Sequence, residues 1–113
     1  MEVAPVSEYP AIIRRIIEEH ARVKPSYGDV DVEAIFDDAH GHYELVYAGW
    51  FKEERIHGPV VHIDIKGDKV WIQFDGTEGG VALELMAQGV PRDHIVLGFQ
   101  SPFMRKHGDF AVG

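Results

Sequence analysis

The stretch RIHGPVVHIDIKGDKVWIQFDG, residues 55–76, contains two apolar alternations separated by a charged glycine turn. Apolar residues recur at every second position on both sides of the turn KGDK, and this period is typical of strands that bury one face. Short turns of this composition join neighbouring antiparallel strands. We therefore predict a hairpin, with an irregularity or bulge in its first strand at Gly58 and Pro59. The side chains predicted to face the core are Val61, Ile63, Ile65, Val70, Ile72 and Phe74.

The same alternation extends upstream of this hairpin. Residues 32–37 and 42–51 alternate apolar and polar side chains around the turn DDAHGH, which predicts two further strands. The apolar face of such a sheet needs a cover, and two amphipathic helices are predicted: one over about residues 8–23, with Ser7 as its N-cap, and one over about 79–88. The predicted fold class is α+β, with a four-stranded or larger antiparallel sheet packed on an N-terminal helix and a second helix in two layers.

The glycine-rich segment DGTEGG, residues 75–80, has two interpretations. Phosphate-binding loops use glycines so that backbone N–H groups can approach an anion, but this segment matches neither GxxxxGK[ST] nor GxGxxG. Asp75 or Thr77 is placed to cap the following helix, and Gly89 is placed just beyond its end. We therefore predict a joint between a strand and a helix.

Length and composition favour a single folded domain over residues 1–113. Of the 113 residues, 45% are hydrophobic and 27% are charged, which is ordinary for a globular protein that folds without a cofactor. The chain has no cysteine, which excludes disulfides and thiolate metal sites and is compatible with a cytoplasmic location. Neither a signal peptide nor a long apolar stretch is visible, so no membrane association is expected.

The net charge of −8 bears on the class of partner. Nucleic-acid-binding proteins usually concentrate positive charge, because phosphate contacts supply most of their affinity. An acidic chain repels DNA and RNA at long range. Direct nucleic-acid binding is therefore not expected, although a direct DNA-binding factor stays open as an alternative.

Two sets of polar residues are candidates for chemistry. Five residues are predicted on or near the polar face of the sheet: Glu44, Asp64, Lys66, Gln73 and Asp75. The acid-x-Lys pattern of Asp64 and Lys66 is similar to the core of metal-dependent nucleases, so Asp64, Lys66 and Asp75 are the candidates for a hydrolase site. His62 and Asp64 are candidate metal ligands because they lie two residues apart on one side of a strand, and His40 and His42 have the same spacing. Such pairs also arise from simple alternation, so we expect neither a catalytic set nor a metal site, and the residues favour a non-enzymatic interaction domain.

Aromatic residues are the candidates for an interface. Trp71 falls opposite the apolar residues of its strand, which places it on the polar face, and three phenylalanines lie in the apolar C-terminal tail. The tail either completes the core or meets a partner. The interface candidates are Trp71, Phe99, Phe103 and Phe110. A homodimer is also expected, because a small sheet with an exposed aromatic gains from being covered.

Five segments together carry a resemblance to a known family. They are PSYGD at 25–29, VHIDIK at 61–66, VWIQFDGTE at 70–78, GVPRDHIVLGFQSPFMR at 89–105 and FAVG at 110–113. In combination they resemble the XisI-like family, the fdxN element excision controlling factor proteins of cyanobacteria, over nearly the whole chain.

The resemblance implies a role in programmed DNA rearrangement by site-specific recombination. It implies an XisH-like companion protein, which resembles an endonuclease, as the main partner, with the recombinase as a further one. It supplies no catalytic residues. With the acidic charge, it leads us to expect a non-catalytic controlling factor that acts by binding its companion. The alternatives are a metal-dependent hydrolase that uses carboxylates on the sheet face and a direct DNA-binding factor.

Overall fold

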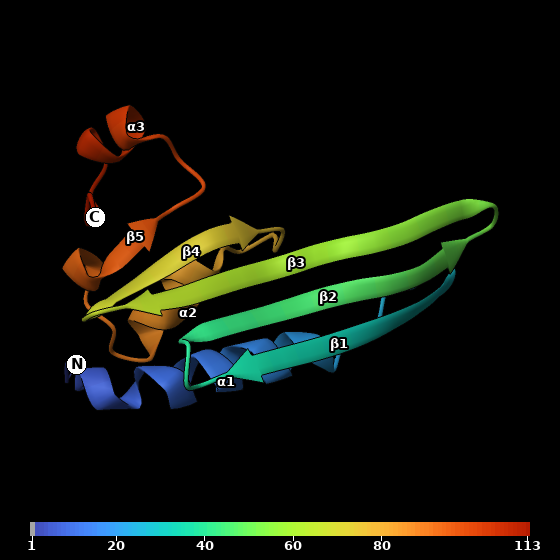
Figure 1. The fold of residues 1–113 in the computed structure, drawn as a ribbon, viewed down its shortest axis with the longest axis horizontal. Helices are drawn as coiled ribbons and strands as arrows, with labels where there is room; N and C mark the ends of the chain where they lie inside the picture. The colour runs from blue at the N-terminus through green and yellow to red at the C-terminus, as the bar shows by residue number, and fades with distance from the viewer. Residues whose placement is uncertain (1) are drawn as a thin grey trace.

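The computed structural model describes residues 2–113 and contains one five-stranded sheet in the order β1-β2-β3-β4-β5 (Figure 1). The strands are β1 (Asp29–Asp37), β2 (His42–Phe51), β3 (Glu54–Lys66), β4 (Lys69–Asp75) and β5 (Ile95–Leu97). The first four pair in sequence order as an antiparallel meander, whereas β5 pairs with β4 in parallel. The predicted meander is therefore confirmed, and β5 adds a fifth strand.

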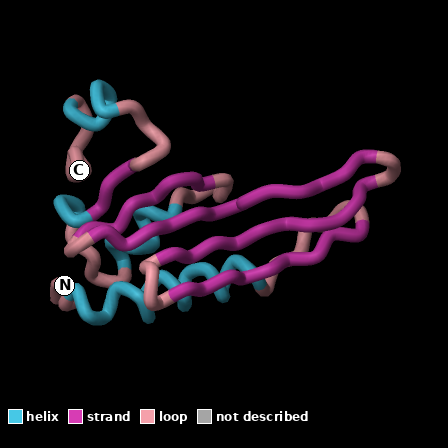
Figure 2. The backbone as a smooth tube through the Cα atoms, in the orientation of Figure 1, coloured by secondary structure: helices cyan, strands magenta, loops and turns pink. Residues whose placement is uncertain are grey.

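Two helices cover one face of the sheet, so the predicted α+β class and two layers are confirmed (Figures 1 and 2). The helices are α1 (Tyr9–Ala21), α2 (Val81–Ala87) and a short C-terminal α3 (Pro102–Lys106). The prediction of Ser7 as the N-cap was wrong, because Ser7 lies in a 3₁₀ helix, Val6–Glu8, and no side chain caps α1. Among residues 2–113, no helix has both the length and the apolar character needed to cross a membrane.

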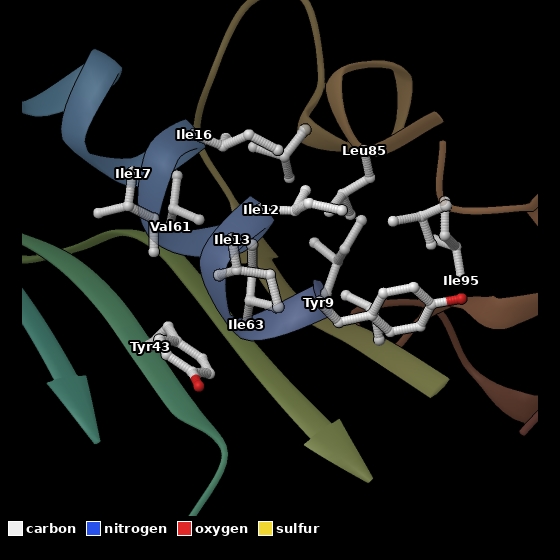
Figure 3. Packing of buried hydrophobic residues seen from close by; sticks show 14 of the residues in the cluster. Tyr9, Ile12, Ile13, Ile16, Ile17, Tyr43, Val61, Ile63, Leu85 and Ile95 are labelled. Carbon is white, nitrogen blue, oxygen red and sulfur yellow. The ribbon is translucent and has the colours of Figure 1, made fainter. Parts of the chain in front are cut away.

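Isoleucines of α1 form the centre of the core (Figure 3). Ile12, Ile13, Ile16 and Ile17 recur at a spacing of three to four, and each is at most 4% exposed. They pack against the strands and against Leu85 of α2. Burying one such side chain contributes about 1.5–3 kcal/mol, so this stripe is a main source of the free energy that holds α1 on the sheet.

Two bulges change which face the side chains of β3 and β4 occupy. Val60 is an extra residue on β3, since Leu45 pairs with Val61 while the next residue of β2 pairs with Pro59. Gln73 is likewise extra on β4. The first bulge adjoins the predicted Gly58-Pro59 irregularity. The second moves Phe74 to the open face, where it is 45% exposed, so the prediction that Phe74 faces the core was wrong.

A buried tyrosine connects the sheet to α1. The Tyr43 hydroxyl donates to Oδ1 of Asp38 at 2.7 Å, and Arg14 of α1 donates to the other oxygen of that carboxylate, also at 2.7 Å. Burial, together with the hydrogen bond to Asp38, raises the pKa of Tyr43 to about 12. The contact therefore depends on a phenol that keeps its proton.

This pKa predicts a stability change in alkaline solution. The folded chain holds the Tyr43 proton more tightly than the unfolded chain, whose phenol titrates near 10.0, so the stabilisation is complete below that pH and is lost as the pH rises toward about 12. Tyr43→Phe should cost about 1 kcal/mol at neutral pH. In urea titrations, this difference from the wild type should shrink between about pH 10 and about pH 12. Tyr27→Phe, at an exposed tyrosine, is the control, and a constant difference for Tyr43→Phe would contradict the account.

Close approach of β1 and β2 requires a glycine at position 49. Gly49 pairs with Val30, and a Cβ atom added to Gly49 would lie 2.6 Å from the Val30 Cα and collide with the Asp29 carbonyl oxygen. Backbone atoms of a paired strand cannot move aside without loss of hydrogen bonds. The register of this pair therefore depends on the missing side chain.

Gly49→Ala should lower the free energy of unfolding by about 1–3 kcal/mol or more, as overpacking does elsewhere. Gly79→Ala is the matched control, because a Cβ there meets no atom within 4 Å. Denaturant unfolding measures both. Equal stability of the two variants would mean that β1 and β2 accommodate the added methyl group without a loss of folding free energy.

Candidate functional site

Four polar side chains form a square on the open face of the sheet, opposite the helices. His42 of β2 pairs with Asp64 of β3, and Glu44 pairs with His62. Cross-strand partners in an antiparallel pair project on the same face, and residues two apart on one strand do so as well. Imidazole and carboxylate groups therefore alternate around the square, which we call the His-acid square.

The members of the His-acid square contact one another directly. Asp64 Oδ1 lies 2.8 Å from His42 Nδ1 and 3.1 Å from His62 Nε2. The second nitrogen of His42, Nε2, lies 3.0 Å from Glu44 Oε2. The two imidazole rings meet edge to face with centroids 4.6 Å apart. Nδ1 of His42, Nε2 of His62 and a carboxylate oxygen of Asp64 thus converge on one point of the sheet surface.

The bulge in β4 supplies a further contact. Gln73, the extra residue, donates from Nε2 to Asp64 Oδ2 at 3.2 Å. Asp64 therefore has three hydrogen-bond partners: His42 and His62 on Oδ1, and Gln73 on Oδ2. Its side chain is 20% exposed, compared with 27% for His62 and 36% for His42.

Charge interactions shift two pKa values in the square. The hydrogen bond to Glu44 raises the pKa of His42, and Asp64 adds to that effect against partial burial. Burial acts to raise the pKa of Asp64, but the hydrogen bonds from His42, His62 and Gln73 outweigh it and leave the pKa below its ordinary value. Asp64 is therefore ionised at neutral pH, and the square favours a positive charge at its centre.

The three residues proposed from the sequence as a hydrolase site are divided between the two faces. Asp64 and Lys66 lie two residues apart on β3, so both side chains project on the open face. Asp75 pairs with buried Val61 and accepts the backbone N–H of Val81 at the start of α2. The prediction that Asp75 lies on the polar face was wrong, because the bulge at Gln73 reverses the alternation. One metal ion cannot bridge carboxylates on opposite faces of a sheet.

The segment 75–80 is a strand-to-helix joint, as predicted. Asp75 Oδ1 accepts the N–H and the hydroxyl of Thr77, and the Thr77 hydroxyl accepts the N–H of Gly80. The backbone N–H groups of Thr77, Gly80 and the following Val81 are thus already bonded to side chains of the joint. The end of α2 was also predicted correctly: Gly89 has φ of 102° directly after the C-cap residue.

A cavity of about 780 Å³ lies beside this joint on the helix-covered face. Its walls come from the end of α1 and the segment after it, from β2 and β3, from the joint and from α2. Val23 and Leu83 are 70% and 60% exposed there, and His20 contacts Glu84 at 2.7 Å on its wall. This cavity could not be predicted from the sequence, because the residues that line it are far apart in the chain.

The four interface candidates differ in exposure. Trp71 does lie on the open face beside Asp64, but Lys66 Nζ is 4.4 Å from its ring centroid and the Arg105 guanidinium is 5.2 Å from it. Phe110 packs against the core. Phe99 and Phe103 are 52% and 68% exposed, so they are the members of this set that present free apolar surface.

Sequence reasoning did not find the complete square. Glu44 and Gln73 were predicted on the polar face with Asp64, but His42 was noted only with His40. The register of β2 with β3 selects His42, whereas His40 lies in the turn and contacts Asp37 at 2.7 Å. The alternating pattern H-x-E in β2 and H-x-D in β3 could have suggested the pairing, but only a known register shows that the two patterns face each other.

Loss of the Glu44 charge should lower the pKa of His42 toward its ordinary value, because the hydrogen bond to Glu44 is the largest cause of the shift. Glu44→Gln keeps the side-chain shape and removes the charge. NMR titration of the imidazole protons in metal-free protein measures the change. Glu54→Gln, an exposed acid further along the hairpin, is the control. An unchanged His42 titration in Glu44→Gln would exclude the contact.

Comparisons with known proteins agree on one family. The model of the XisI protein family matches residues 3–112. A crystal structure of a XisI-like protein from Anabaena variabilis ATCC 29413 has 36% identity and a TM-score of 0.89, with 96% of this chain and 100% of that chain covered. The fdxN element excision controlling factor XisI from the same organism has 27% identity and a TM-score of 0.83, with 96% and 98% covered. No curated protein matches. Because the family model spans the sheet, both covering helices and the tail, this chain belongs to the XisI family.

Proposed function

We propose that this protein is a non-catalytic controlling factor for the excision of a DNA element, and that it acts by binding an XisH-like companion protein. Membership of the XisI family is the observation that carries the proposal, since one similar structure is that of an fdxN element excision controlling factor. The separation of Asp64 from Asp75 supports the non-catalytic part. The net charge of −8 favours a protein partner over direct contact with DNA.

The edge strand β1 is the best candidate surface for such a partner. It carries four acidic residues and no basic residue in the sequence DVDVEAIFD. Asp29, Asp31 and Glu33 are exposed, and they alternate along the strand, so their side chains project on the same face. As the first strand in the sheet order, β1 also has one side without a partner strand in residues 2–113.

Complementary charge would then drive the association. Proteins that act on DNA present basic surfaces, and an acidic strand accelerates encounter with such a surface and fixes orientation. This contact would compete with DNA for the same basic residues of the companion. Control of excision would follow from that competition.

Neutralising the strand should weaken the complex. The triple variant Asp29→Asn, Asp31→Asn, Glu33→Gln should reduce the association rate with the XisH-like companion encoded nearest to this protein by about tenfold or more at low salt. Surface plasmon resonance over a salt series measures this rate. The control is Glu18→Gln, Glu53→Gln, Asp109→Asn, which removes the same charge from three exposed acids elsewhere.

Other outcomes would overturn specific parts of the proposal. Equal effects of the two triple variants would assign the attraction to net charge and remove β1 as the binding surface. Separate elution of the two proteins in size-exclusion chromatography at micromolar concentration would remove the companion. Light scattering of the protein alone tests the expected homodimer, and a gel shift at low salt tests direct DNA binding.

A further inference from the structure

We propose that His42, His62 and Asp64 bind one divalent transition-metal ion of the zinc class on the open face of the sheet. This inference goes beyond the accessory function and does not depend on it. The three residues offer one ligand atom each, and these atoms lie within 4.8 Å of one another.

The ligand types indicate the class of ion. Two imidazole nitrogens and one carboxylate oxygen are typical of Zn²⁺ and of its neighbours Co²⁺ and Ni²⁺. Mg²⁺ and Ca²⁺ prefer sites made of oxygen ligands alone. A set with two histidines therefore discriminates against the abundant hard cations.

Two of the three spacings between the ligand atoms are close to those of a tetrahedral site. Bonds of about 2.0–2.1 Å to zinc place neighbouring ligand atoms about 3.3 Å apart. Asp64 Oδ1 now lies 2.8 Å from His42 Nδ1 and 3.1 Å from His62 Nε2. An outward shift of a few tenths of an ångström brings these two pairs to the tetrahedral spacing, and partly exposed side chains can make such a shift.

Neighbouring residues already hold two of the three ligands, His42 and Asp64, in the required orientation. Histidines that bind metals usually donate their second N–H to a carboxylate, which fixes the ring and strengthens the ligand. Glu44 occupies this position, 3.0 Å from His42 Nε2. Gln73 holds Asp64 Oδ2 at 3.2 Å and so leaves Oδ1 for the ion. These two contacts are the observation that distinguishes the square from an accidental pair of histidines.

The scaffold and the charge also favour a cation. All three ligands project from the paired strands β2 and β3, whose register fixes their separation. The square contains two carboxylates and no lysine or arginine, and the protein as a whole has a net charge of −8. With three protein ligands, the coordination of zinc leaves a fourth position toward solvent, which water fills in such sites.

Calorimetric titration with zinc chloride tests the site directly. The sample is the full chain without an affinity tag, after treatment with a chelator. We expect one ion per chain with a dissociation constant in the micromolar range or below. Co²⁺ should give the visible absorption bands of a tetrahedral site. Absence of heat and of these bands would overturn the proposal and leave a hydrogen-bonded cluster only.

Variants assign the ligands. His62→Gln and Asp64→Asn each remove a ligand and should abolish detectable binding, whereas Glu44→Gln should weaken it about 10–100-fold, as loss of such a neighbour does in known sites. His57→Gln and His40→Gln are matched controls, because both histidines are exposed and lie outside the square. Circular dichroism confirms that each variant is folded. Equal binding by His62→Gln and the wild type, or loss of binding in either control, would place the ion elsewhere and overturn the assignment.

Discussion

The pairing of β2 with β3 determines both faces of this molecule. On one face, the register aligns Tyr43 with Ile63 and Leu45 with Val61, which are the side chains that α1 covers. On the other face, the same register aligns His42 with Asp64 and Glu44 with His62. A slip of one residue would exchange the faces, exposing the core and burying the four polar groups. The stability of the core therefore also preserves the geometry of the His-acid square.

Local patterns in the sequence were sufficient to predict α1, α2 and the first four strands. The isoleucines of α1 repeat at helical spacing, the first four strands alternate, and Gly89 ends α2, so these elements were visible without knowledge of their neighbours. The short β5 and α3 were not predicted. The faces of Phe74 and Asp75 could not be predicted, since the bulge at Gln73 reverses the alternation after it. Nothing in the letters around Gln73 marks that bulge, because it arises from the pairing of β4 with β3.

The candidate site was harder to predict than the fold for a related reason. His62 and Asp64 were visible as a pair on one strand, but a site needs groups that converge from different strands. His42, which joins them, lies 20 positions upstream of His62 on the other strand of the hairpin. Register is the information that the sequence lacks, and it is the quantity that decides which polar residues meet. The interface candidates had the same limit, because Arg105 reaches Trp71 from a tail whose path was unknown.

The two edges of the sheet have different surroundings. At β5, Ala111 donates its N–H to the Ile95 carbonyl and forms a bridge with Val96, so the tail covers that short edge. At β1 the edge has no such strand beside it within residues 2–113. Edge-to-edge association through backbone hydrogen bonds would therefore end at two chains and could not propagate into a fibre. In that pair of β1 strands, rows of carboxylates from both copies would repel each other, so a strand of opposite charge would be preferred over a second copy of this chain.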